Sequence, residues 1–72
     1  MARSKHPWRM LERNTRIYVK HEYFGYSRQE LSDEYHITRQ RVIQIIDSVH
    51  YRVTHEDTEY VSEVKKILSN QQ

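Results

Sequence analysis

Two short amphipathic segments flank a tight turn in the stretch RQELSDEYHITRQRVIQII, residues 28–46. In the first segment Leu31 and Tyr35 are four residues apart, so they share one face of a helix. In the second segment apolar residues recur at spacings of three and four, which indicates a buried stripe along a helix. The stripe consists of Val42, Ile45, Ile46 and Val49. The pattern predicts helices over about 28–35 and 39–50.

Residues that start helices stand directly before both segments. Ser27 and Glu30 form the pattern S-x-x-E, a capping box in which each side chain accepts a hydrogen bond from a free backbone N–H group. Thr38 is suited to cap the second helix. The turn between the two helices is therefore short, and Ile37 is expected to pack into it.

A further helix is predicted on the N-terminal side, over about residues 9–23. Gly25 is the single glycine of the chain and is expected to end this helix in the left-handed conformation. Alternatively, Asn14 or Thr15 caps a shorter helix and divides the segment in two. The inward face holds Leu11, Tyr18 and either Ile17 or His21.

A fourth helix is predicted over about residues 56–68. Residues 54–57 read T-x-x-D, which suits a cap, and acidic residues precede Lys65 and Lys66, as the helix dipole favours. This helix offers more apolar surface than a small core needs, so we expect it to form a dimer interface; the alternative is that it covers the three-helix core. The apolar residues are Tyr60, Val61, Val64, Ile67 and Leu68.

Length and composition fit one small all-α domain. The chain has 72 residues, of which 36% are hydrophobic and 31% charged, so it can build one core and differs from a disordered tail. We expect a basic arm at 1–8, a domain of four helices at 9–69 and a frayed tail at 70–72. The sequence contains no cysteine, which excludes disulfides and thiolate metal sites.

Charge is distributed unevenly, although the net charge is only +2. Residues 1–20 carry six Lys and Arg side chains and one Glu, whereas residues 53–72 carry two lysines and four acidic residues. A basic end and an acidic end indicate a polyanionic partner on one side. The alternative is ordinary surface charge.

If the apolar stripe faces inward, helical geometry fixes the outward face of the helix over 39–50. Its residue types suit major-groove reading, because Arg pairs with guanine, Gln with adenine, and Ile contacts the thymine methyl group. The alternative is that they only solvate an exposed helix. The expected base-reading residues are Arg39, Gln40, Ile43, Gln44 and Asp47. The expected phosphate-binding residues are Ser27, Arg28, Thr38, Arg41, Arg3, Lys5 and Arg9, with Arg13 or Arg16 as weaker candidates.

Residues 28–46 resemble the helix-turn-helix of DNA-binding regulators, above all the region of sigma-70-type factors that reads the promoter −35 element, known as region 4. They also resemble the DNA-binding part of Mor-type phage activators. The resemblance implies that the outward residues from Arg39 to Gln44 contact bases. Ser32 stands where the family has alanine, because the two helices approach closely there. His36 replaces the usual turn glycine and Ile43 a basic residue, so the target need not be a −35 element.

Together these features predict a sequence-specific transcription regulator of bacterial, phage or mobile-element origin. It would act by operator occupancy as a repressor, as a homodimer on an inverted repeat of double-stranded DNA. One alternative is a sigma-like accessory factor that binds RNA polymerase as well as promoter DNA. Another is an adaptor that binds only proteins.

No enzyme signature is present, since the sequence contains neither a Gly-rich phosphate loop nor a convincing nucleophile. We therefore expect no catalytic residue, no cofactor and no metal. His50 and His55 are five residues apart and do not share one helix face. No apolar run approaches the roughly 20 residues that span a bilayer, and no signal peptide is evident, so a cytoplasmic protein is expected.

Overall fold

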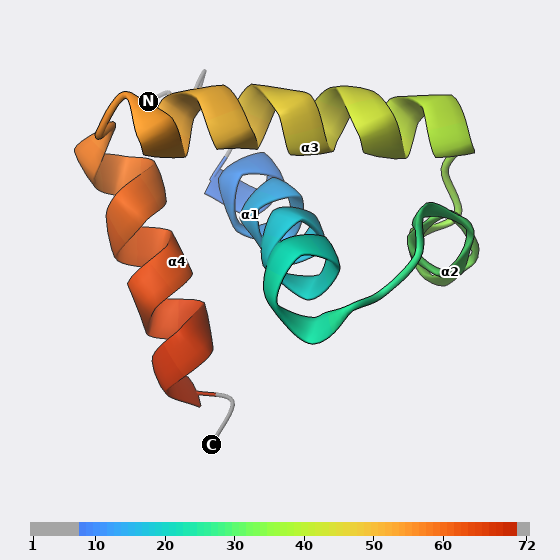
Figure 1. Cartoon of the computed structure of the whole chain (residues 1–72), viewed down its shortest axis with the longest axis horizontal. Helices are drawn as coiled ribbons and strands as arrows, with labels where there is room; N and C mark the ends of the chain where they lie inside the picture. Colours follow the sequence, from blue (N-terminus) through green and yellow to red (C-terminus); the bar gives the residue numbers. More distant parts are fainter. Residues whose placement is uncertain (1–7, 71–72) are drawn as a thin grey trace, which may run out of the picture.

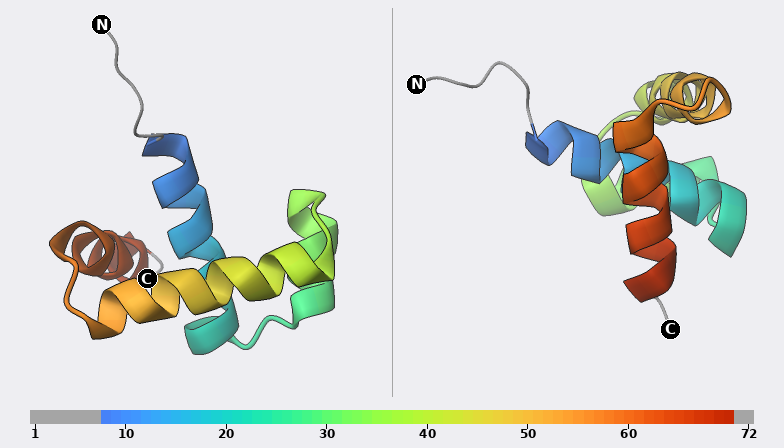
Figure 2. Two further views of the ribbon diagram at one scale, coloured as in Figure 1. Left: turned by 90° about the horizontal axis from the view of Figure 1, so that it is seen from above. Right: turned by 90° about the vertical axis from the view of Figure 1, so that its left-hand side faces the viewer.

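Four α-helices make up residues 8–70, the part of the chain that the computed structural model describes. The long helix α3 crosses α1, while α2 and α4 lie at its two ends (Figure 1, Figure 2). None of the four helices is long and apolar enough to cross a membrane. The predicted all-α class is confirmed. The helices are α1 (Trp8–Phe24), α2 (Arg28–Tyr35), α3 (Arg39–Thr54) and α4 (Thr58–Asn70).

The outer ends of α1 and α4 differ slightly from prediction. Trp8 already belongs to α1, so the predicted arm at 1–8 is one residue too long. Asn70 belongs to α4, so the predicted tail at 70–72 also begins too early. Residues 1–7, with Arg3 and Lys5, and residues 71–72 lie outside the described residues.

The junction between α3 and α4 lies further along the chain than predicted, and the proposed T-x-x-D cap is wrong. The hydroxyl of Thr54 donates to the carbonyl of Tyr51 within α3, at 3.1 Å. Asp57 caps α4 instead, because its Oδ1 accepts from the backbone N–H of Glu59 at 3.2 Å. As a result α3 continues to Thr54 and α4 begins only at Thr58.

Three helices end at a residue with positive φ. Gly25 has φ +80°, as predicted for the glycine after α1, while His36 and Glu56 adopt +57° and +58°. At such an end a following amide donates back to the last turn, as Ile37 N–H does to the carbonyl of Ser32 at 3.1 Å. The left-handed conformation costs a residue with a Cβ atom about 1–2 kcal/mol. His36 and Glu56 therefore hold their turns against an intrinsic preference.

One hydrophobic core joins all four helices. The predicted stripe of α3 is entirely buried, and Leu31 of α2 packs into the same core, with Tyr35 and Ile37 half-buried against it. Of the two alternatives for α1, Ile17 is buried completely and His21 only in part. The core consists of Ile17, Tyr18, Val19, Leu31, Val42, Ile45, Ile46, Val49, Val64 and Ile67.

Helix α1 is continuous, so the alternative that Asn14 or Thr15 caps a shorter helix is wrong. Thr15 is completely buried, and its hydroxyl donates to the carbonyl of Leu11 at 2.7 Å. Asn14 accepts from the guanidinium of Arg13 at 3.0 Å. Both polar side chains therefore find partners without interrupting the helix.

The apolar face of α4 packs against the core of its own chain. Val64 and Ile67 are 5% and 6% exposed, and Tyr60 and Leu68 pack partly buried against the core. Val61 is half-buried. Tyr60, Val61 and Leu68 keep part of their surface exposed, so a dimer interface on α4 stays a prediction.

A single lysine ties α1 to α2. The Lys20 ammonium lies 2.6 Å from Glu34 and 5.3 Å from the ring centroids of both Tyr26 and Tyr35. Burial lowers the pKa of Lys20, but Glu34 and Tyr35 together outweigh that effect, so its pKa is raised above the usual value. Lys20 is thus held charged, and it fixes the position of α2 beside α1.

Candidate nucleic-acid interface

The outward face of α3 is solvent-exposed along its whole predicted length. All five predicted base-reading residues are exposed, opposite the buried stripe of the same helix. Ile43 is 40% exposed, so an apolar side chain stands among polar ones on this face. The residues are Arg39, Gln40, Ile43, Gln44 and Asp47.

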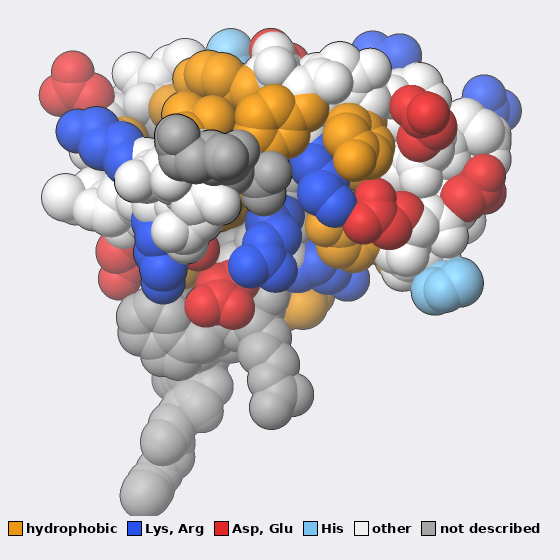
Figure 3. Space-filling model, turned by 90° about the horizontal axis from the view of Figure 1, so that it is seen from below, with side chains coloured by type: hydrophobic (Ala, Val, Ile, Leu, Met, Phe, Trp, Pro, Cys, Tyr) orange, Lys and Arg blue, Asp and Glu red, His pale blue; other side chains and the backbone are white. Residues whose placement is uncertain are grey.

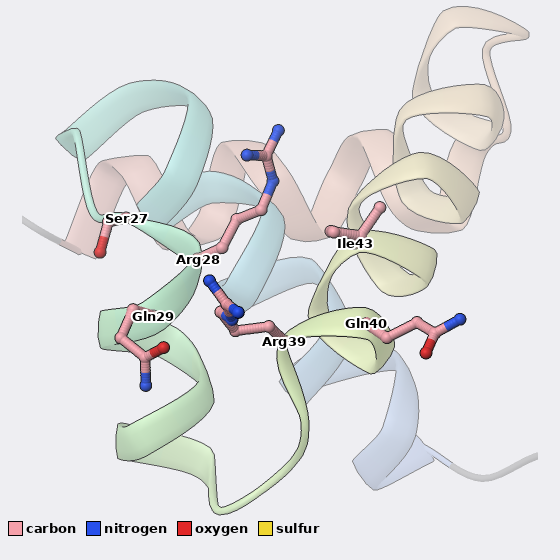
Figure 4. A pocket seen from close by; sticks show the side chains of 6 residues that line it. All are labelled: Ser27, Arg28, Gln29, Arg39, Gln40 and Ile43. Atoms are coloured by element: carbon pink, nitrogen blue, oxygen red, sulfur yellow. The ribbon is translucent and has the colours of Figure 1, made fainter.

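A shallow hollow of about 580 Å³ lies where the starts of α2 and α3 meet, and we term it the α2–α3 hollow. Figure 4 shows that the Arg39 side chain reaches back toward α2, while Gln40 points away on the other side of α3. The lining includes two arginines and no carboxylate, so the hollow favours an anion. It is lined by Ser27, Arg28, Gln29, Arg39, Gln40 and Ile43.

Helix caps fix the two N-termini at this hollow. Ser27 accepts from Glu30 N–H at 3.0 Å, and Glu30 accepts from Ser27 N–H at 2.8 Å, which confirms the predicted capping box. Thr38 accepts from Arg41 N–H at 3.1 Å, which confirms the second cap. Each helix N-terminus carries a partial positive charge, which the Glu30 carboxylate offsets at α2. The first turn of α3 holds no acidic residue, so its dipole adds to the attraction for an anion.

The cations at the hollow are available to a ligand. The ion pairs among residues 8–70 join Lys20 to Glu34 and Arg52 to Asp57, so neither Arg28 nor Arg39 is neutralised by a carboxylate. Arg41 contacts only an amide oxygen, that of Gln44, at 3.3 Å.

The predicted phosphate-binding residues fall into separate groups. Ser27 and Arg28 line the hollow, and Thr38 and Arg41 stand at the start of α3. Arg9 lies in the first turn of α1, and the placement of its side chain is not described. The weaker candidates lie elsewhere: Arg13 is bound to Asn14, and Arg16 lines a different hollow with residues of α1 and α4.

Gln29 was missed by sequence reasoning, although it lines the hollow. Its amide donates to Asp33 at 3.0 Å, one turn along α2. The signal was its place beside Arg28 in the first turn after the capping serine, where side chains surround the helix N-terminus.

A second hollow, of about 430 Å³, lies at the opposite end of α3, and we term it the α3–α4 hollow. Here Arg52 pairs with Asp57 at 3.2 Å, and the rings of Tyr51 and His55 stack at 3.9 Å. No group of three metal-binding side chains forms among residues 8–70. The lining residues are Ser48, Tyr51, Arg52, His55 and Asp57.

The side of the molecule away from α3 has a mixed character. Figure 3 shows hydrophobic side chains there interleaved with both basic and acidic ones. At the end of α1 and in the loop that follows, Tyr23, Phe24 and Tyr26 are exposed by 54%, 39% and 37%. By contrast, the only charged side chains among residues 8–70 that line the α2–α3 hollow are Arg28 and Arg39.

The chain matches no family model, no curated protein and no solved structure.

Proposed function

We propose that this chain is a sequence-specific DNA-binding protein of the helix-turn-helix kind, with the start of α3 in the major groove. The α2–α3 hollow carries this proposal. It combines two helix N-termini with two arginines that no carboxylate neutralises, directly beside an exposed face of Arg, Gln and Ile. A surface that holds phosphates and presents base-reading side chains needs these elements together.

The proposed contacts with DNA fall into two classes, those to phosphates and those to base edges. The hydroxyls of Ser27 and Thr38, the Arg28 guanidinium and the free N–H groups of the two helix starts hold phosphates and set the orientation. Arg39 and Gln40 project from the first turn of α3 toward base edges, where Arg pairs with guanine and Gln with adenine. Ile43 meets a thymine methyl group one turn later.

The biological role that fits best is a bacterial, phage or mobile-element transcription regulator that represses by occupying its operator. A single helix reads only a few base pairs, so we propose a homodimer on an inverted repeat, with half-sites about one helical turn apart. The surface of α4 that remains for this dimer consists of the partly exposed residues Tyr60, Val61 and Leu68.

Selection of bound duplexes from a random pool tests the proposal. The wild-type chain is expected to recover a consensus, and Arg39→Ala to blur it at one position by about 1–3 kcal/mol. Arg52→Ala is the matched control, because it removes the same side chain from the opposite end of α3. Recovery of no consensus by the wild type would sink sequence-specific reading.

The exposed aromatic residues favour a second candidate function, a sigma-like accessory factor that binds RNA polymerase together with promoter DNA. Three aromatic side chains are exposed within four residues of one another, and exposed apolar groups of this kind suit a protein partner. They belong to Tyr23, Phe24 and Tyr26. Size-exclusion mass with and without polymerase distinguishes this candidate from a dimeric repressor. A purely protein-binding adaptor would instead leave activity unchanged in Arg39→Ala and Gln44→Ala.

A further inference from the structure

Asp47 is a misfit on the face proposed to meet DNA. It is the only acidic residue of α3, and its side chain is exposed. It follows Gln40 by seven residues and Gln44 by three, so all three stand on one side of the helix. A face that approaches a polyanion therefore carries an unexplained negative charge.

No neighbouring group neutralises this charge. Among the described side chains Asp47 takes part in neither of the two ion pairs, which join Lys20 to Glu34 and Arg52 to Asp57. Arg39 lies eight residues earlier, which corresponds to about 12 Å along the helix axis. The carboxylate of Asp47 thus enters the proposed interface without a partner of its own.

An unpartnered carboxylate in the groove loses its hydration and is repelled by phosphates, so it is tolerated only where the DNA supplies a hydrogen-bond donor. Only two base groups donate in the major groove, the N4 amino group of cytosine and the N6 amino group of adenine. Guanine offers acceptors alone, and thymine an acceptor and a methyl group. Each of these would face the carboxylate unfavourably.

Resting on the proposed function, we infer that Asp47 is a specificity residue that admits duplexes in which the base it faces on one strand is cytosine or adenine, whose amino group donates to the carboxylate. It penalises duplexes with guanine or thymine at that position. There no base donor offsets the repulsion between the Asp47 carboxylate and the DNA phosphates. Asp47 therefore lowers affinity for unrelated DNA while raising discrimination.

Selection from a random pool, followed by affinity measurements on the consensus and on unrelated duplexes, tests this role. The wild type is expected to show one position restricted to cytosine or adenine, with a penalty of about five- to one-hundred-fold for the other bases. Asp47→Ala is expected to lose that restriction and to bind unrelated DNA more tightly. Asp47→Asn keeps an acceptor and gains a donor, so its preference is expected to shift to adenine.

Glu22→Gln is the matched control, because Glu22 is exposed on α1 and the substitution removes one negative charge far from the proposed face. It is expected to leave the consensus unchanged. Circular dichroism confirms that each variant is folded. If Asp47→Ala retains the full consensus, or tightens binding equally on all duplexes, the specificity role is wrong while the proposed function stands. A wild type without any consensus overturns both.

Discussion

The two ends of α3 carry hollows of similar size but different electrostatic character: the cations are unpaired at one end and neutralised at the other. At the α2–α3 hollow Arg28 and Arg39 are free of carboxylates, and the start of α3 adds positive potential. At the α3–α4 hollow Arg52 is held by Asp57, the residue that also caps α4. Both hollows contain arginine, so the residue type alone does not distinguish one hollow from the other.

The difference teaches that anion affinity follows from which cations are left unpaired. The net charge of the chain is only +2, and it would not single out either end. A carboxylate 3.2 Å from a guanidinium cancels most of its field at a distance, whereas an unpaired guanidinium attracts phosphate. The comparison therefore predicts where DNA binds and which substitutions move that preference.

The largest expected effect, on both stability and DNA binding, comes from weakening the packing of α2 against α3. Leu31 is completely buried, so Leu31→Ala is expected to lower the free energy of unfolding by about 2–5 kcal/mol, measured by urea denaturation. Ile67→Ala is the matched control on α4, with a similar cost in stability. At a temperature where both variants remain folded, only Leu31→Ala is expected to weaken DNA binding. Equal weakening by both would argue against a specific role for the α2–α3 hollow.

A smaller effect is expected when the carboxylate of the α3–α4 hollow is removed. Asp57→Asn keeps a capping side chain for α4 but frees Arg52, so affinity for unrelated DNA is expected to rise roughly five- to ten-fold at 0.1 M salt. The slope of log affinity against log salt steepens by about one. Arg28→Ala at the other end should change both quantities in the reverse direction. An unchanged slope in Asp57→Asn would show that pairing is not what separates the two ends.

The smallest effect concerns the turns at the two ends of α3. His36→Gly and Glu56→Gly each relieve a left-handed backbone, so each is expected to raise the free energy of unfolding by up to about 1 kcal/mol, reduced by the entropy of glycine. Gly25→Ala is the reverse control, because an added Cβ there meets no atom within 4 Å and only the backbone is strained. Thermal unfolding measures all three. A loss of stability in Glu56→Gly would contradict the assigned strain.

Local chemistry made part of the fold predictable. The capping box at Ser27 and the cap at Thr38 fixed the starts of α2 and α3, and the stripe of α3 is buried as its spacing indicates. Because that stripe is inward, the exposure of the opposite face followed from helical geometry. These features depend on residues a few positions apart, so a single sequence contains them.

Tertiary packing determined the rest. Periodicity predicted one inward face for α1, yet Thr15 and Val19 are also buried, because α1 packs against both α3 and α4. The turn at Glu56 after α3 lacked a signal in the sequence, since glutamate rarely adopts positive φ. Whether Arg52 or Arg28 stays unpaired likewise depends on which elements meet at each end of α3.

The length of α3 has a consequence for how the molecule can be extended. Its sixteen residues span about 24 Å, whereas the major groove is about 12 Å wide. With the turns up to Asp47 in the groove, the remainder of α3 projects outward and carries α4 with it. The end of α4 lies across the molecule from α2 (Figure 1). Asn70 is therefore a natural attachment point, where a reporter or a second DNA-reading unit can be fused without rebuilding the contact surface.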